Sequence, residues 1–238
     1  MADGEARALA LALADRRVLI TGASRGIGAA VASGAAAFGA TVIRVARSAL
    51  PPLDGAVDYR ADLADPRDRD RVLREIMAGG LPDAVVSNAG AFLVAPIEET
   101  TDALLREQLA INLEAPLAIA RHFLPAMRAR GRGIHVLIGS VADTKAFPGN
   151  AAYAASKFGA RGLHEVLCEE FRGTGVRCTL ISPGPTDTAA WDPVDPDHHE
   201  GFTRRADMLC TSDVAEAVIY ALTAPSHVHL ESIRLGPA

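Results

Sequence analysis

Three side chains in the middle of the chain have types and spacing suited to proton transfer. Tyr153 and Lys157 lie four residues apart, so on a helix they share one face. Because a free tyrosine has a pKa of about 10, it exchanges protons poorly at neutral pH, and a nearby ammonium favours its phenolate. The hydroxyl of Ser140 both donates and accepts hydrogen bonds, so it can hold a substrate oxygen while Tyr153 exchanges a proton with it. This set predicts alcohol and carbonyl chemistry.

The elements around these residues predict how they are positioned. Alternating β-branched residues at Ile134, Val136 and Ile138 indicate a buried strand that ends at Gly139, immediately before Ser140. A helical pattern begins at Ala151. Ligands of open α/β sheets bind at the carboxyl ends of the strands, which is where this order places Ser140. A Tyr-x-x-x-Lys pair also occurs by chance on helix surfaces, so the rest of the chain has to decide between the two interpretations.

A glycine-rich turn near the amino terminus is the second candidate site. Residues 17–21 read as a strand, residues 22–28 as a turn, and the following residues to about Phe38 as a helix. Gly22 permits a tight turn, whereas Gly26 and Gly28 let the backbone and the start of the helix approach a pyrophosphate. A strand, a glycine turn and a helix in this order predict a dinucleotide site.

With these motifs the chain resembles the classical short-chain dehydrogenase/reductase family over nearly its whole length. The residues that carry the resemblance are Thr21-Gly22-Ala23-Ser24-Arg25-Gly26-Ile27-Gly28, Asn88-Ala89-Gly90, Asn112, Ser140, Tyr153, Lys157 and Pro183-Gly184. The resemblance implies an α/β fold of the Rossmann type. We therefore expect one NAD(P)-binding domain over residues 1–238, with a doubly wound, mostly parallel sheet of about seven strands and helices on both faces.

The resemblance also implies roles for individual residues. The catalytic residues would be Asn112, Ser140, Tyr153 and Lys157, with Asn112 distorting its helix so that a water links Lys157 to solvent; a plain helix asparagine is the alternative. The cofactor-binding residues would be Gly22, Ser24, Arg25, Gly26, Ile27, Gly28, Arg47, Ser48, Asp62, Leu63, Asn88, Ala89, Gly90, Tyr153, Lys157, Pro183, Gly184, Thr186 and Thr188. Of these, Asp62 has a turn role as its alternative.

The residues after the second strand, residues 41–45, predict which cofactor is used. An acid there favours NAD(H), and a base favours the 2′-phosphate of NADP(H). The chain has Arg47, whose planar guanidinium suits a phosphate, and Arg25 in the glycine turn can approach from the other side. We predict NADP(H) in preference to NAD(H). The alternative is that both arginines are solvated surface charges.

Residues 189–208 are rich in Asp, Pro and His and lack periodicity, and by resemblance they form a lid over the substrate. Candidate pocket walls are Phe92, Val94, Phe147 and Trp191, although core positions are equally compatible with their types. The adjacent His198 and His199 do not have the spacing of metal ligands, so no metal is predicted.

Composition excludes several other classes of function. The net charge is −5 with scattered basic residues, which argues against nucleic-acid binding. No run reaches the roughly 18 apolar residues of a membrane span, and the acids beside Arg7 argue against a signal peptide in the Ala/Leu run of residues 8–14. The three cysteines lack metal or disulfide spacing, which favours reduced thiols and a cytoplasmic location.

The sequence therefore predicts an NADP(H)-dependent oxidoreductase that interconverts a carbonyl and a secondary alcohol, on a small ketone or hydroxy-acid-type substrate. A 3-oxoacyl thioester reductase is the alternative among enzymes, and a non-catalytic NADP-binding regulatory protein is the alternative in another class. The helix after Tyr153 has more apolar residues than one face requires. The resemblance implies that it forms a subunit interface, so a homodimer or homotetramer is expected.

Overall fold

The structure of the protein is a computed structural model in which residues 11–238 are described. Arg7 and the first part of the Ala/Leu run that follows it lie outside the described residues. A seven-stranded sheet forms the centre, with strand order β3-β2-β1-β4-β5-β6-β7 and every neighbouring pair parallel. The strands are β1 (Arg17–Thr21), β2 (Thr41–Ala46), β3 (Val57–Arg60), β4 (Ala84–Ser87), β5 (Gly133–Ile138), β6 (Val176–Pro183) and β7 (Ser232–Leu235).

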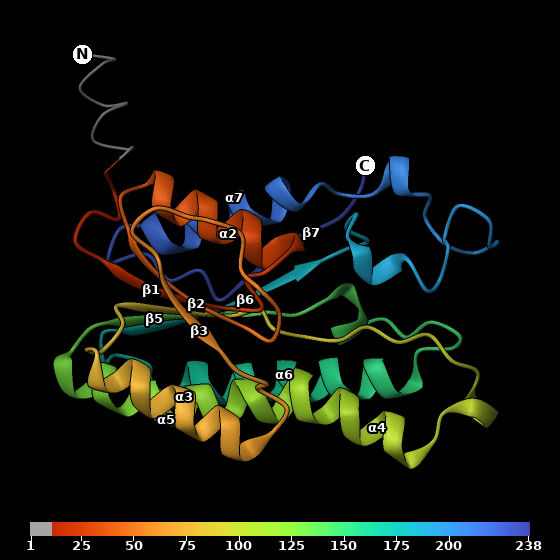
Figure 1. Ribbon diagram of the computed structural model, residues 1–238, viewed down its shortest axis with the longest axis horizontal. Coiled ribbons are helices and arrows are strands. Elements are labelled where there is room, and N and C mark those ends of the chain that lie inside the picture. The colour runs from red at the N-terminus through yellow and green to blue at the C-terminus, as the bar shows by residue number, and fades with distance from the viewer. Residues whose placement is uncertain (1–10) are drawn as a thin grey trace.

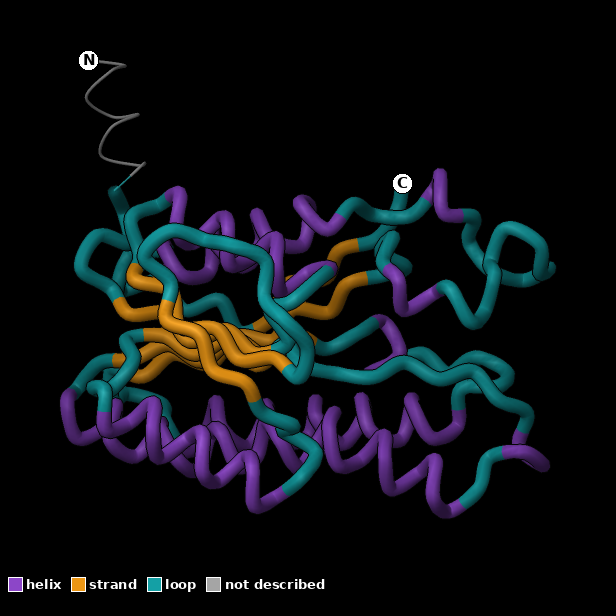
Figure 2. Tube along the Cα trace, viewed as in Figure 1, coloured by secondary structure: helices purple, strands orange, loops and turns teal. Residues whose placement is uncertain are grey.

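Helices cover both faces of the sheet, as Figures 1 and 2 show. On one face lie α2 (Gly26–Ala37) and α7 (Thr211–Thr223), which pack against each other. The other face carries α3 (Pro66–Ala78), α4 (Asp102–Leu109), α5 (Ala115–Arg130) and α6 (Ala151–Glu170). The predicted α/β fold with a doubly wound parallel sheet is therefore confirmed, and the sheet is parallel throughout. Within residues 11–238, none of the helices has the length and apolar character needed to cross a membrane.

The alternation of side chains along each strand gives the molecule two cores. In β1, Val18 and Ile20 point toward α2 and α7, whereas Leu19 points to the opposite face and packs in the cluster that contains Phe123 and Met127 of α5. All five of these side chains are buried. Strands covered on both faces in this way are rich in apolar β-branched residues, which is why these segments could be recognised in the sequence.

The sheet has its topological switch point between β1 and β4. The chain winds outward from β1 through β2 to β3, then returns to β4 on the other side of β1 and continues to β7. The Asn88 side chain fixes the two carboxyl ends together, because its amide nitrogen donates to the carbonyl of Thr21 at 2.9 Å and to that of Gly22 at 3.3 Å. In an open α/β sheet this crevice is where ligands bind.

Candidate active site

Three of the four predicted catalytic side chains, Ser140, Tyr153 and Lys157, meet at one cavity of about 760 Å³ at the carboxyl edge of the sheet. Strand β5 ends at Ile138, and Ser140 follows as the cap of a short 3₁₀ turn (Val141–Asp143), where its hydroxyl accepts from the backbone N–H of Ala142 at 3.1 Å. Tyr153 and Lys157 come from the first turns of α6 and line the same cavity. The strand–turn–helix order therefore brings Ser140, Tyr153 and Lys157 together.

Lys157 is buried behind the tyrosine. Its ammonium donates to the carbonyl of Ile138 at 3.1 Å and lies 5.7 Å from the centroid of the Tyr153 ring. Burial lowers the pKa of Lys157 to about 8, against the opposing effect of the negative charge of Asp143. Lys157 is therefore a fixed cation beside Tyr153 that loses its proton only above about pH 8.

The ionisation of Tyr153 differs from the prediction made from its spacing to Lys157. Burial raises the pKa of Tyr153 to about 12; hydrogen bonding with Ser140 opposes the rise, and the charge of Asp143 adds to it. The side chain is half-buried, because it borders the open cavity, yet the loss of water around it outweighs any stabilisation of the phenolate. The predicted lowering of the pKa is thus wrong, and the phenol keeps its proton at neutral pH.

Asn112 lies in a π-helical segment, Ala110–Glu114, which joins α4 to α5. Its side-chain oxygen accepts from the N–H of Ala91 at 3.0 Å, and its amide nitrogen donates to the carbonyl of Ala91 and to the hydroxyl of Ser156, each at 2.9 Å. A Cβ on Gly90 would lie 2.9 Å from the Asn112 oxygen, so this close approach requires glycine. The expected helix distortion is present, while the water link to Lys157 stays a prediction.

Asp143 is a residue of the site that the sequence did not single out. Its carboxylate has no exposed surface and accepts a hydrogen bond from the Ser182 hydroxyl. Its Oδ1 makes no hydrogen bond with the described residues, and instead faces the guanidinium groups of Arg161 at 3.6 Å and Arg234 at 3.5 Å. Nothing in the local sequence separates this acid from a solvated turn residue, because its partners lie on α6, β6 and β7.

The glycine turn borders a second cavity, of about 390 Å³. The predicted cofactor residues that line it are Gly22, Ser24, Arg25, Gly26, Ile27, Arg47, Ser48, Leu63, Asn88, Ala89, Gly90 and Thr188. Pro183, Gly184 and Thr186 line the first cavity together with Thr188. Gly28 packs behind the turn, where a Cβ would lie 2.3 Å from the carbonyl oxygen of Gly22. Asp62 is not among the lining residues, although its neighbours Ala61 and Leu63 are.

The residues of the second cavity fit a dinucleotide phosphate. The start of α2 faces it with Gly26, whose φ of +58° is readily adopted only by glycine, and two arginines and two serines supply hydrogen-bond donors. Arg47 has an exposed side chain 3.9 Å from the Asp62 carboxylate. An exposed, planar cation of this kind suits a phosphate group.

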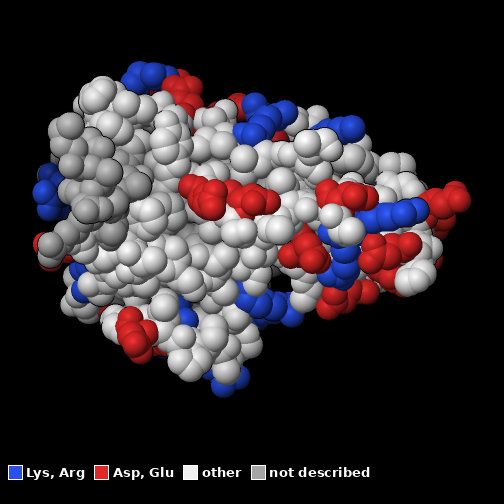
Figure 3. Space-filling model, turned by 90° about the horizontal axis from the view of Figure 1, so that it is seen from above, with Lys and Arg blue, Asp and Glu red and all other residues white. Residues whose placement is uncertain are grey.

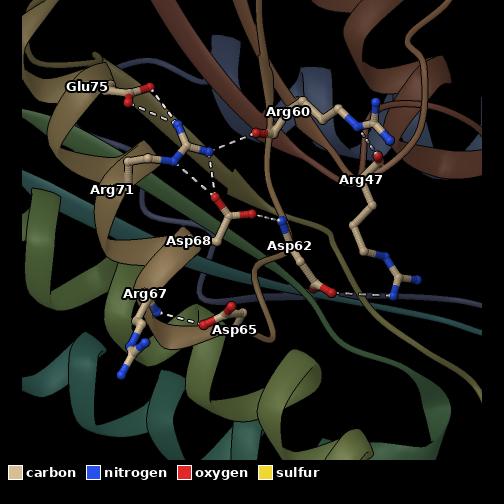
Figure 4. A network of polar contacts seen from close by, with 8 residues as sticks. All are labelled: Arg47, Arg60, Asp62, Asp65, Arg67, Asp68, Arg71 and Glu75. Atoms are coloured by element: carbon tan, nitrogen blue, oxygen red, sulfur yellow. Dashed lines mark hydrogen bonds and ion pairs between the residues drawn. The ribbon is translucent and has the colours of Figure 1, made fainter.

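A polar network from α3 holds the backbone beside Arg47 (Figure 4). Arg60 donates to the carbonyl of Arg47 at 2.9 Å, and the carbonyl of Arg60 accepts from Arg71 at 3.0 Å. Arg71 in turn pairs with Glu75 and with Asp68, whose carboxylate accepts from the N–H of Asp62 at 2.7 Å. Arg60 at the end of β3 therefore holds the loop after β2, and α3 in turn holds Arg60 and the loop after β3.

The predicted lid, residues 189–208, has two short 3₁₀ turns, Ala189–Trp191 and Arg205–Asp207, and is otherwise irregular. Arg205, near the end of this segment, is linked to its beginning by ion pairs with Asp187 at 2.7 Å and with Asp192 at 2.5 Å. Viewed from the side of α2 and α7, acidic and basic side chains gather at the end of the molecule that carries this segment (Figure 3). The predicted pocket walls Phe92, Val94, Phe147 and Trp191 all line the first cavity.

Several known proteins are similar to this chain in sequence or fold. The chain is 34% identical over 197 residues to a 3-dehydrosphinganine reductase of Arabidopsis thaliana, a match that covers 78% of this chain and 60% of that relative's length. A solved structure from Beutenbergia cavernae, assigned as an NAD(P)-dependent gluconate 5-dehydrogenase and holding NADP, matches with a TM-score of 0.84 and 32% identity, over 94% of this chain and 96% of the other. A 3-oxoacyl (acyl-carrier-protein) reductase of Agrobacterium tumefaciens with NADP bound also has a TM-score of 0.84, at 28% identity and 95% coverage of both chains.

A family model identifies the family of this chain, and it matches the part of the chain that forms most of both cavities. The family model for short chain dehydrogenases matches residues 16–199. This range contains the glycine turn, the loops that line the second cavity, and the Ser140, Tyr153 and Lys157 side chains. On these grounds, the chain belongs to the classical short-chain dehydrogenase/reductase family.

Proposed function

We propose that this protein is an NADP(H)-dependent carbonyl reductase that interconverts a small ketone, or a hydroxy-acid-type compound, and the corresponding secondary alcohol. The observation that carries the proposal is the junction of the two cavities. Ile27, Asn88, Gly90 and Thr188 line both cavities, so a dinucleotide that occupies the glycine-turn cavity would reach the cavity of Ser140 and Tyr153. A hydride donor and a proton donor would then meet at one substrate carbonyl.

The chain's own residues would supply binding, orientation and the proton. When bound, the cofactor supplies hydride to the carbonyl carbon or accepts it from the alcohol carbon. Ser140 holds the substrate oxygen by a hydrogen bond, and Tyr153 transfers its proton to that oxygen as negative charge develops there. Lys157 keeps a positive charge beside the tyrosine and would hold the nicotinamide ribose. Reduction therefore consumes one hydride and one proton and yields the secondary alcohol.

The first test is oxidation of NADPH by the purified protein, followed by absorbance, with small keto acids, cyclic ketones, sugars and 3-oxoacyl thioesters. We expect turnover with at least one carbonyl class and none without a carbonyl compound. NADPH binding is measured in parallel by its fluorescence. Bound NADPH with no turnover of any class would favour the non-catalytic alternative.

Cofactor preference is proposed to depend on Arg47. Replacing it with aspartate removes a charge-assisted contact to the 2′-phosphate and adds repulsion, so the ratio of kcat/KM for NADPH to that for NADH should fall by about tenfold or more. Arg67→Asp is the matched control, because Arg67 is exposed on α3 and does not line either cavity. An unchanged ratio in Arg47→Asp would remove Arg47 from cofactor recognition.

A 3-oxoacyl thioester reductase is the second candidate function. The apolar lining of the first cavity would accommodate an acyl chain, and the similar Agrobacterium structure is a reductase of this kind. The carbonyl panel separates the two, because this candidate requires that 3-oxoacyl thioesters outcompete small ketones.

The proposal includes assembly into a homodimer or homotetramer through α6. Phe158 and Val166 on this helix, and Leu117 on α5, are 46%, 53% and 47% exposed. Covering these side chains with a second copy would remove apolar surface from water. The cytoplasmic location stays a prediction.

A further inference from the structure

The cavity beside Ser140 and Tyr153 has a wall built from aromatic rings. Phe92 packs edge-on against the catalytic Tyr153 with centroids 5.0 Å apart, Trp191 follows at 4.7 Å from Phe92, and Phe202 lies 5.9 Å from Trp191. The indole N–H of Trp191 donates to the carbonyl of Thr186 at 3.1 Å, so its one polar group is already bonded to protein. The wall therefore offers a substrate an apolar surface that begins at the Tyr153 ring.

The charges around the cavity are the second observation. Its lining residues all belong to the described part of the chain, and among them only Lys157 and Glu200 are charged. Lys157 is buried and donates to Ile138. Two further cations lie near the cavity without lining it. Arg205 is paired with Asp187 and Asp192, and the ammonium of Lys145 lies 5.5 Å from the centroid of the Phe147 ring. A carboxylate or phosphate on a substrate would enter apolar surroundings without a counter-ion of its own, which is unfavourable.

We propose that the substrate of this site is an uncharged ketone with an aromatic or alicyclic body, and not a hydroxy acid, keto acid or phosphorylated sugar. This inference rests on the proposed carbonyl reductase function and narrows its substrate class. The carbonyl oxygen binds at Ser140 and Tyr153, and the body of the molecule lies against Phe92 and Trp191. Aromatic and apolar surfaces stacked in this way add binding free energy beyond simple burial.

Trp191 provides a direct probe, because it is the only tryptophan in the chain. Its fluorescence is followed while the protein, saturated with NADP⁺ so that no reduction occurs, is titrated with a matched pair of ketones. The pair is 4-oxocyclohexanecarboxylate and its uncharged methyl ester, which differ in charge and share a ring and a carbonyl. We expect the ester to bind at least about tenfold more tightly, since only the acid loses hydration of a charge.

Adding a cation to the cavity wall tests whether the lack of a counter-ion causes the preference for an uncharged ketone. Phe147 lines the cavity and is 40% exposed, so Phe147→Arg can be accommodated and would place a cation at the wall. This variant should shift the preference toward the acid by about tenfold or more. Tyr220→Arg is the matched control, because Tyr220 is 59% exposed on α7 and lines neither cavity. It should keep the preference of the wild type.

Equal or tighter binding of the acid by the wild type would overturn the inference, as would a failure of both ketones to change the fluorescence. Turnover is measured separately with NADPH and the same pair. Preferential binding of the ester without any reduction would contradict the proposed function and leave the apolar, uncharged ligand class supported. Reduction of the acid in preference to the ester would contradict the inference and support the proposed function.

Discussion

Replacement of Tyr153 by phenylalanine is expected to lower kcat for carbonyl reduction by about 10²- to 10⁴-fold, the range typical for loss of a positioned proton donor. The ring that packs against Phe92 remains, and Lys157 keeps its bond to Ile138, so the cavity should keep its shape. The affinity for NADPH, measured by its fluorescence, should therefore stay close to that of the wild type. Loss of kcat with intact cofactor binding is the signature of a proton-transfer role.

The pH dependence follows from the two buried groups. Because burial raises the pKa of Tyr153 to about 12, the phenol carries its proton throughout the neutral range and is ready to donate it in reduction. Alcohol oxidation instead needs the phenolate, whose fraction rises about tenfold per pH unit below that pKa. Oxidation should therefore rise with pH, and reduction should decline above about pH 8, where Lys157 loses its proton. Initial rates in both directions across roughly pH 6 to 10 check this expectation.

Tyr220→Phe is the control for the tyrosine substitution, because Tyr220 is exposed on α7 and loses the same hydroxyl far from both cavities. Its kcat should equal that of the wild type. A Tyr153→Phe variant that retains comparable turnover would contradict the role of Tyr153 as proton donor, whichever substrate is used.

The second large effect concerns the buried carboxylate of Asp143. Replacing both Arg161 and Arg234 with leucine leaves this charge fully buried with no cation facing its Oδ1. Removal of the partners of a buried charge costs about 3–5 kcal/mol of the free energy of unfolding. Because small domains are stable by only about 5–15 kcal/mol, we expect a large drop in the midpoint of denaturant unfolding.

A third substitution distinguishes electrostatics from packing. Adding Asp143→Asn to the double variant removes the uncompensated charge, while an amide oxygen can still accept from Ser182. Most of the lost free energy of unfolding should return. The control is Glu165→Gln, which breaks only an exposed ion pair of Arg161 and should cost less than about 1 kcal/mol. A triple variant no more stable than the double variant would show that the loss comes from packing.

Much of the fold could be predicted because its signals are local. The apolar β-branched runs at Val18–Ile20 and Ile134–Ile138 are long enough to fix buried strands, and the glycine turn between β1 and α2 has its own spacing. Ser140, Tyr153 and Lys157 could be placed for the same reason, since one strand end and one helix start determine their positions.

What the sequence could not predict depends on contacts between distant segments. The pKa of Tyr153 depends on how completely the surrounding protein, including Phe92, removes water from its side chain. The spacing between Tyr153 and Lys157 predicts only the effect of the lysine charge. Asp143 is recognisable only when Arg161 and Arg234 are seen beside it. Similarly, the mostly apolar character of the substrate cavity, in which Lys157 is the one cation among the lining residues, is seen only once the complete set of lining residues is known.

The position of Arg234 on β7 has a consequence for the order of folding. Synthesis from the amino terminus produces Asp143 well before its second cation, and β7 is the last strand of the sheet in chain order. A nascent chain that has assembled β1 to β6 would hold the Asp143 carboxylate beside Ser182 while half of its charge compensation is missing. A sheet of β1 to β6 alone is therefore expected to be less stable than the complete sheet, because one of the two cations that face the carboxylate arrives only with β7.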